Sequence, residues 1–242
     1  MRTLIIFITL LLASFKIYSQ EKKVNFIIEG GTTISLPKTS DLIDSYEGNS
    51  YIIKTTPNVG IYVTPSINLN VSEKIFINTG LGYTLNRFKI QNTIGYLNES
   101  GTRNIHQIQT PLSLGFKLKN NFSIVTGGTL NYIISAKVNS SSDIDNNIPI
   151  YDPAEAEFVN NYSSEDNYSI LDEYNRFNFG IFTKIKKEFN LNQSKKGFIS
   201  IRVHQFLNAT KSRETPDIPS NIVTFNNEKE PTIINLGFGI IL

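Results

Sequence analysis

The chain has 242 residues, enough for one all-β domain of barrel or sandwich size, and it contains no cysteine. Without cysteine it has no disulfide, no lipidated N-terminal cysteine, no thiolate chemistry and no zinc site built on cysteine. Charges nearly balance, at 23 Lys and Arg against 21 Asp and Glu, and no basic run is present, so nucleic acid is excluded as a partner.

The first residues, MRTLIIFITLLLASFKIYSQ, predict a secretory signal peptide. Arg2 supplies the positive start, and residues 4–13 form an apolar stretch. This stretch is too short to cross a bilayer, since a helix needs about 20 residues. We therefore expect a signal peptide at residues 1–19 and an exported domain at residues 20–242. Removal of the peptide takes away Arg2 and Lys16 and no acid, which leaves the exported chain formally neutral.

Apolar and polar residues alternate along the rest of the chain with a period of two, which predicts β-strands. No segment after residue 20 has the length and apolarity of a membrane-spanning helix, so a membrane role would require a closed barrel of strands. The alternating runs cover residues 24–34, 59–71, 75–90, 108–118, 122–134, 176–189, 198–208 and 234–242.

The connections between these runs are alternately long and short. In an up-and-down meander, alternate connections emerge at the same end, so one end would carry the short turns and both termini. Transmembrane barrels have this asymmetry, with short periplasmic turns and longer extracellular loops. The short connections are residues 72–74, 119–121 and 190–197, and the predicted long loops are residues 36–56, 91–103, 138–172 and 211–230.

Two kinds of barrel differ in the side of the sheet that carries the apolar residues. A soluble lipocalin-like barrel places its apolar face inside and a charged face in water, whereas a narrow membrane barrel packs small polar residues inside. In the second, third and fifth runs the polar face is uncharged and rich in Gly, Ser, Thr and Asn. The sequence therefore predicts an all-β fold, an eight-stranded antiparallel up-and-down transmembrane β-barrel with periplasmic termini.

Two prolines interrupt this pattern. Pro65 and Pro111 fall within predicted strands, and proline cannot donate to a strand ladder. Because a closed barrel has no free edge, we expect a bulge or a local opening at each proline.

The absence of Trp weakens the aromatic girdle that membrane barrels carry at both ends of their lipid-facing surface, but other aromatic residues lie near both predicted ends. Phe116, Phe122 and Phe189 lie near the short-turn end, and Tyr83, Tyr132 and Phe177 lie nearer the other end.

The stretch HQIQTPLSLGFKLKNNFSIVTGGTLNYIIS joins a Pro-Leu run to a short turn and a Gly-rich strand. It resembles the fourth and fifth strands of PorT-like outer-membrane β-barrel proteins of the Bacteroidetes type, and FNFGIF, IRVHQFLNA and the terminal INLGFGIIL are similar to that family too. Gln109, Phe206-Leu207 and Leu242 depart from its pattern. The resemblance implies an outer-membrane barrel over the exported chain. The best-known member is implicated in type IX secretion and gliding, a role that these motifs do not carry over.

Charged and titratable residues of the predicted interior should form a polar network, because an unpaired charge in a narrow barrel is costly. Its predicted members are Glu29, Lys184, Arg202 and His204. His106, at the loop end of its strand, is expected at the lipid interface. A hydrolase would need one of the two histidines paired with Ser or Asp. No such motif is present, so we predict no enzymatic activity.

The connection 138–172 is strongly acidic. DIDNN at residues 143–147 begins like a calcium loop, but Ile148 stands where the turn needs Gly and Ala154 where the loop needs Glu. We expect a solvated extracellular loop, with weak cation binding or a surface partner as alternatives, and we predict no cofactor and no metal. Its acidic residues, extended to residue 175, are Asp143, Asp145, Asp152, Glu155, Glu157, Glu165, Asp166, Asp172 and Glu173.

These observations predict a small outer-membrane barrel with a structural or surface-interaction role. Its expected partners are outer-membrane lipid and an envelope or surface protein bound through the long loops, where binding functions usually lie. An accessory role in an envelope or secretion complex fits the same pattern. The alternative is a soluble periplasmic or secreted lipocalin-like binder of a hydrophobic ligand.

Overall fold

A computed structural model describes residues 24–38, 43–46, 49–94, 97–144, 150–152, 157–159, 163–192, 195–208 and 229–242, with backbone alone at the outer ends of several strands. The predicted signal peptide lies outside these residues. The strands are β1 (Val24–Lys38), β2 (Ile43–Tyr46), β3 (Asn49–Asn70), β4 (Ile75–Gly80), β5 (Gly82–Ile94), β6 (Leu97–Lys117), β7 (Phe122–Ile144), β8 (Ile150–Asp152), β9 (Glu157–Val159), β10 (Ser163–Ser169), β11 (Phe177–Asn190), β12 (Lys196–Phe206) and β13 (Lys229–Ile241), with 3₁₀ turns η1 (Lys119–Asn121) and η2 (Leu171–Glu173).

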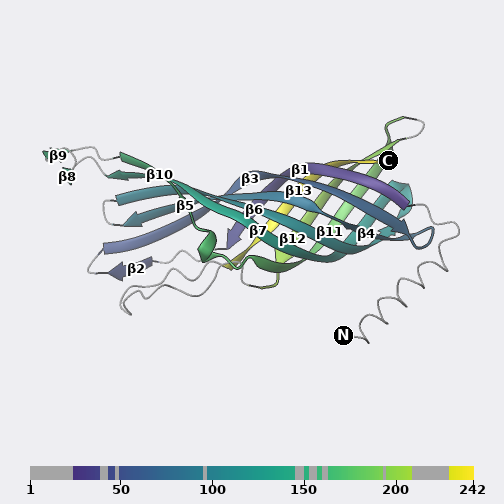
Figure 1. The fold of residues 1–242 in the computed structure, drawn as a ribbon, viewed down its shortest axis with the longest axis horizontal. Coiled ribbons are helices and arrows are strands. Elements are labelled where there is room, and N and C mark those ends of the chain that lie inside the picture. Colours follow the sequence, from purple (N-terminus) through teal and green to yellow (C-terminus); the bar gives the residue numbers. More distant parts are fainter. Residues whose placement is uncertain are drawn as a thin grey trace.

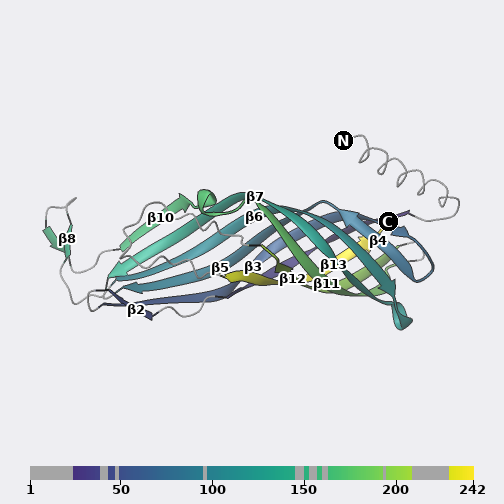
Figure 2. The same ribbon diagram turned by 90° about the horizontal axis from the view of Figure 1, so that it is seen from below.

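The strands pair antiparallel and close into a ring. From β1 the pairing runs through β3, β4 and β5, β6, β7, β11, β12 and β13, and β13 pairs again with β1. β4 and β5 follow one another in a single position of the wall, so the predicted eight positions are present although the third is divided. The prediction of an all-β antiparallel barrel is confirmed (Figures 1 and 2).

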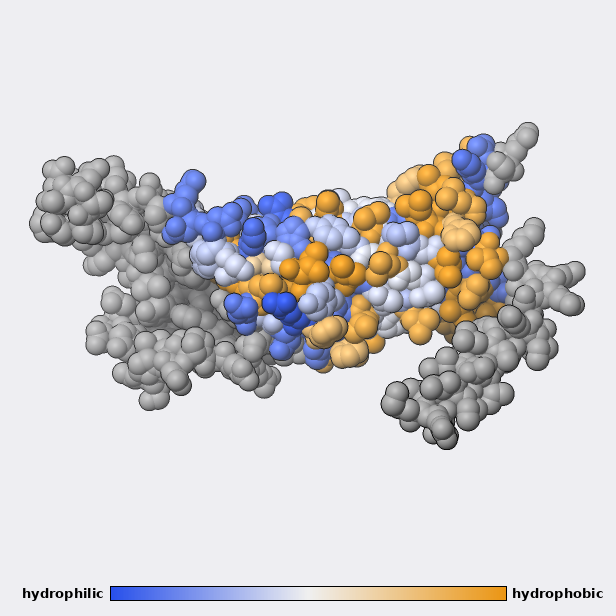
Figure 3. Space-filling model, viewed as in Figure 1, coloured by the Kyte–Doolittle hydropathy of each residue, from blue (hydrophilic) through white to orange (hydrophobic). Residues whose placement is uncertain are grey.

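The apolar residues of the barrel wall lie on its outside. On β12, Ile199, Ile201 and Val203 are about half exposed, whereas Ser200, Arg202 and His204 between them are buried. The same alternation holds around the ring, and Figure 3 shows the hydrophobic residues gathered over the right-hand part of the molecule. The lipocalin-like alternative is wrong, because it requires the apolar residues inside.

In the part of the chain that is described, no helix has both the length and the apolarity needed to cross a bilayer.

Aromatic pairs mark both ends of the apolar outer surface, as predicted. Tyr132 and Phe177 lie 4.9 Å apart between ring centroids at the end with long strands, and Phe189 and Phe238 lie 6.2 Å apart at the end with short turns. About ten residues of β6 separate the two levels, which at about 3.3 Å per residue and a tilt of roughly 40° span about 25 Å. The apolar surface therefore matches the thickness of a membrane.

The two prolines border the same break in the wall. Pro65 pairs with Ile28 of β1 and Pro111 with Thr129 of β7 without a register shift. On their other sides both prolines meet the gap between β4 and β5 at Leu81, whose backbone N–H donates to the Pro65 carbonyl at 3.1 Å. The predicted local opening is thus confirmed, and the two prolines share one interruption of the wall. Neither Pro65 nor Pro111 has a backbone N–H that could donate a hydrogen bond to the strand beside it.

The predicted long loops are wrong in two places. Within residues 91–103, β5 and β6 are paired out to Ile94 and Leu97. β3 already begins at Asn49, within the predicted loop 36–56. Residues 138–172 include the end of β7 and all of β10, and residues 211–228 lie outside the described part. The strands extend beyond the membrane, where the outer face is polar and the inner face buries Phe88, Ile90 and Val138, so the apolar residues no longer lie on the outer face.

Candidate functional site

A buried carboxylate lies at the centre of the barrel. Glu29 of β1 forms an ion pair with Lys184 of β11, with 2.9 Å between Nζ and Oε2. Its other oxygen accepts hydrogen bonds from the hydroxyls of Tyr62 and Ser200, at 2.9 and 2.6 Å. Four strands therefore converge on one carboxylate, which ties opposite parts of the wall together.

Arg202 completes this cluster from β12. Its guanidinium lies 5.5 Å from the ring centroid of Tyr62 and donates to Gln109 Oε1 at 3.1 Å. The close packing requires Gly237, since a Cβ there would collide with the Tyr62 hydroxyl. The structure thus brings Glu29, Lys184 and Arg202 together, as the sequence predicts for the interior network.

His204 belongs to a separate interior group. Its Nε2 is 2.8 Å from the Thr129 hydroxyl, which also accepts a hydrogen bond from Asn131. Its Nδ1 has no hydrogen-bond partner in the part of the chain described, so no carboxylate orients the ring. A catalytic arrangement of Ser or Asp, His and an orienting acid is not formed there.

His106 lies on the outer face, at the level of the aromatic girdle. Its Nδ1 is 2.6 Å from the hydroxyl of Tyr83. The register of β6 and β7 shifts between His106 and Gln107, which marks the level where the barrel gives way to the extended hairpins. The pair fits the interfacial position predicted for His106.

An apolar cluster covers the inner face of β5, β6 and β7 at the end with long strands. The segment 170–174, between β10 and β11, turns inward, and the Ile170 N–H donates to the Ala136 carbonyl at 2.9 Å. Sequence reasoning placed this segment in an acidic loop, although its Ile-Leu-x-x-Tyr pattern was a usable signal. We call the cluster the inner lid; it comprises Phe88, Ile90, Ile105, Ile133, Ala136, Val138, Ile170 and Tyr174, with Leu171 packed against it.

Replacing Ile170 by Ala should loosen the inner lid without unfolding the barrel. Truncating a buried Ile costs about 2–5 kcal/mol, and here most of that cost falls on local opening. We expect the Ile170 amide to exchange its hydrogen roughly 30-fold faster or more. Leu171→Ala, at a partly buried position, serves as the control with a smaller change, and an unchanged exchange rate in Ile170→Ala would contradict the lid.

The other end of the interior is also filled. Lys186 forms an ion pair with Glu188 at 2.7 Å. Its ammonium lies 5.2 Å and 5.0 Å from the ring centroids of Phe76 and Phe198, both fully buried. Aromatic rings and a paired lysine thus occupy the barrel near the short turns.

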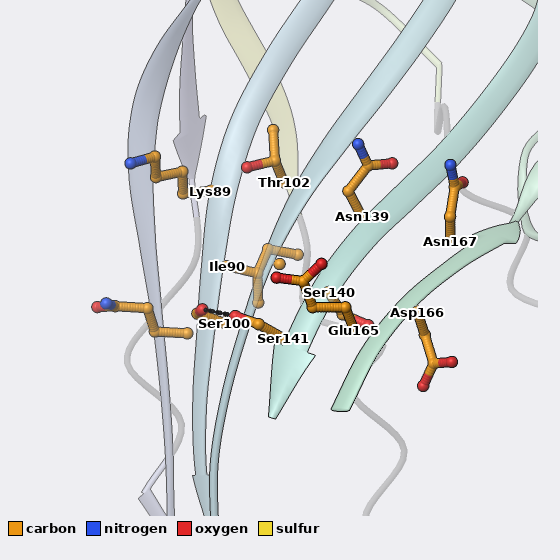
Figure 4. Close-up of a pocket in the computed structure, with 12 residues that line it drawn as sticks. Lys89, Ile90, Ser100, Thr102, Asn139, Ser140, Ser141, Glu165, Asp166 and Asn167 are labelled. Atoms are coloured by element: carbon orange, nitrogen blue, oxygen red, sulfur yellow. Dashed lines mark hydrogen bonds between the residues drawn. The ribbon is translucent and has the colours of Figure 1, made fainter. Parts of the chain in front are cut away.

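Beyond the girdle, β3, β5, β6, β7 and β10 continue as a sheet, with β2 beside β3 (Figures 1 and 2). Lys89, Thr102, Asn139 and Asn167 form one row across four strands. Gln91, Ser100, Ser141 and Glu165 form the next row, with the Ser100 and Ser141 hydroxyls 2.9 Å apart. Both rows line a groove of about 580 Å³, shown in Figure 4.

The predicted acidic loop is described only in part. Asp145 and Glu155 lie outside the described residues, and Asp143, Asp152 and Glu157 lie in β7, β8 and β9 where the backbone alone is described. Among the described side chains, three or more potential metal ligands nowhere come together. Cation binding by this loop stays a prediction.

Comparison with known proteins identifies one matching family model and several similar solved structures. The family model "Outer membrane protein beta-barrel domain" matches residues 18–208. No curated protein matches the chain. The chain is similar to the outer membrane protein OprG from Pseudomonas aeruginosa, with 14% identity, a TM-score of 0.43, and coverage of 92% of this chain and 97% of OprG.

Two further crystal structures are similar over most of their length. Ail, the attachment invasion locus protein of Yersinia pestis, in complex with the heparin analogue sucrose octasulfate, has 8% identity, a TM-score of 0.40, and coverage of 91% and 99% of the two chains. Neisserial surface protein A has 8% identity, a TM-score of 0.39, and coverage of 91% and 98%.

Proposed function

The chain belongs to the family of outer membrane proteins that carry this β-barrel domain, and from this premise we propose that it is a closed, non-catalytic barrel that displays a β-sheet for contact with a partner at the cell surface. The chain lies in the outer membrane. Its short turns face the periplasm and its extended hairpins face outward, as in barrels of this class.

The observation that carries this proposal is the continuation of strand pairing past the membrane. β5 and β6 remain paired for several residues beyond the girdle, out to Ile94 and Leu97, and β10 extends the sheet beside β7. A paired sheet holds its side chains in fixed rows, which a flexible loop does not. Such a surface suits recognition more than simple shielding.

The filled interior supports a role other than transport. The inner lid, the Glu29 cluster and the Phe76–Lys186–Phe198 group follow one another along the barrel axis. An eight-stranded barrel is just wide enough for its own side chains to fill it. Among the described residues no carboxylate orients either histidine, as a hydrolase would require, which supports a non-catalytic role.

The finer assignment is also a proposal. The paired sheet beyond the membrane fits an accessory role in an envelope or secretion complex. In that case the displayed sheet would contact another envelope protein, and loss of the chain would weaken that complex.

Two measurements test this function. In planar bilayers the purified barrel should show no ion conductance, because its interior is filled. A photo-cross-linking amino acid at Asn139 should capture a specific surface molecule on whole cells, while the same group at Ile201 should capture only membrane lipid. A steady open conductance, or the absence of any capture at Asn139, would contradict the proposal.

A further inference from the structure

The outer face of β5, β6 and β7 changes chemistry in steps as it leaves the membrane. Strand register defines successive rows across the three strands. The first row is aromatic and apolar, with Tyr83, Ile108 and Tyr132. Two rows farther out stand Arg87, Asn104 and Lys137, followed by Lys89, Thr102 and Asn139, and then by Gln91, Ser100 and Ser141.

The basic side chains of this face have no acidic partner in the part of the chain described. Lys89 and Lys137 are exposed, and no carboxylate among the described residues forms an ion pair with them. Arg87 donates its Nε to Asn104 Oδ1 at 2.9 Å, which holds the guanidinium on the outer face. Three positive charges therefore stand on this face, and Glu165 of β10, in the row of Ser141, forms no ion pair with them.

The distance of these basic side chains from the aromatic row, along the membrane normal, places them beside lipid headgroups. Arg87 is four residues beyond Tyr83 on β5, which at about 3.3 Å per residue and roughly 40° tilt is about 10 Å along the membrane normal. Charges that close to a membrane surface act within about one Debye length of its anionic groups. Across the barrel, Val203 and Gln205 of β12 and Leu207 just past its end carry no charge on the outer face.

We propose that this outer face binds the phosphorylated sugar headgroup of a glycolipid in the outer leaflet. Arg87, Lys89 and Lys137 hold its phosphates. In the groove of Figure 4, the amides and hydroxyls of the outer rows donate hydrogen bonds to its sugar hydroxyls and accept hydrogen bonds from them, and the Glu165 carboxylate accepts hydrogen bonds from sugar hydroxyls as well. The apolar row below receives its acyl chains. This inference rests on the surface-display function proposed above and names the class of its partner.

The test compares lipid binding by four purified proteins in detergent micelles, measured by native mass spectrometry with bis-phosphorylated lipid A. They are the unaltered barrel, the Arg87→Gln/Lys137→Gln variant, a control, Lys119→Gln/Lys195→Gln, that loses the same charge at the short turns, and a charge-preserving variant. At about 1 kcal/mol per basic residue, the Arg87/Lys137 variant should bind roughly 30-fold more weakly, and the control should bind normally. The charge-preserving variant, Arg87→Lys/Lys137→Arg, should retain most of the binding.

Several results would overturn the inference. The first is that the Gln variant binds lipid A as tightly as the unaltered barrel does. The second is that the unaltered barrel binds dephosphorylated lipid A or phosphatidylglycerol as tightly as bis-phosphorylated lipid A. The third is displacement of lipid A by millimolar inorganic phosphate, which would indicate a free-phosphate site. The two proposals fail separately. A conducting barrel, or one without surface capture, contradicts the display function, whereas a sealed barrel that captures a surface protein and ignores lipid A contradicts only this inference.

Discussion

Replacing Glu29 by Gln is expected to lower the free energy of unfolding by about 3–5 kcal/mol. The substitution preserves size but leaves Lys184 without its ion-pair partner inside the barrel, with Arg202 nearby. Removal of one member of a buried pair is costly because the remaining charge stays desolvated. Denaturant titration of the barrel in micelles or bilayers measures the change.

Two further variants show whether the loss of stability comes from the unpaired charge or from a lost hydrogen bond. Ser200→Ala removes one hydrogen bond to the same carboxylate and should cost only about 1 kcal/mol. Arg202→Met removes a charge and should also lower the unfolding temperature. If Glu29→Gln and Arg202→Met both unfold like the unaltered barrel, the interior cluster contributes nothing to stability.

Introducing a lysine at Ile201 should destabilise the barrel by about 2–4 kcal/mol. Ile201 is 55% exposed at the middle of β12. In a water-soluble protein, a charge at so exposed a site would change stability by no more than about 0.5 kcal/mol. In a membrane it meets hydrocarbon, so refolding into lipid bilayers should show the full cost.

Leu207→Lys is the matched control for that experiment. Leu207 lies just past the end of the same strand, is 63% exposed, and stands at the level of the upper girdle. There the cost should fall to about 0–1 kcal/mol. Equal and small effects at both positions would mean that Ile201 meets water rather than lipid.

The barrel itself could be predicted because lipid imposes a simple pattern. Ile199, Ile201 and Val203 must be apolar, and Ser200 and Arg202 between them must not, so alternation marks each lipid-spanning strand. The extension beyond the girdle could not be predicted in this way. Asn104, Thr102 and Ser100 face outward on β6 and are polar. Arg103, whose guanidinium lies 5.8 Å from the Phe88 ring centroid, is polar too although it faces the inner lid, so the residues of this stretch show no period that distinguishes a strand from a loop.

The interior cluster could be anticipated only in part. Glu29, Lys184 and Arg202 share the interior parity, and charges in a narrow barrel need partners, which predicts that they meet. Which atoms pair depends on the stagger of eight wall positions, and the sequence does not define it. The contact of His204 with Thr129, and the insertion of Ile170 and Tyr174 into the mouth, follow from that stagger.

The most direct test of the account uses the absence of cysteine in this chain. Single variants Asn139→Cys, Ile201→Cys and Lys119→Cys, placed on the outer sheet, the lipid-facing wall and a short turn, are treated on whole cells with a membrane-impermeant maleimide. We predict labelling of Asn139→Cys on intact cells, of Lys119→Cys only after the outer membrane is permeabilised, and of Ile201→Cys in neither case. Labelling of Ile201→Cys, or of Lys119→Cys on intact cells, would contradict the lipid-facing wall or the orientation of the barrel.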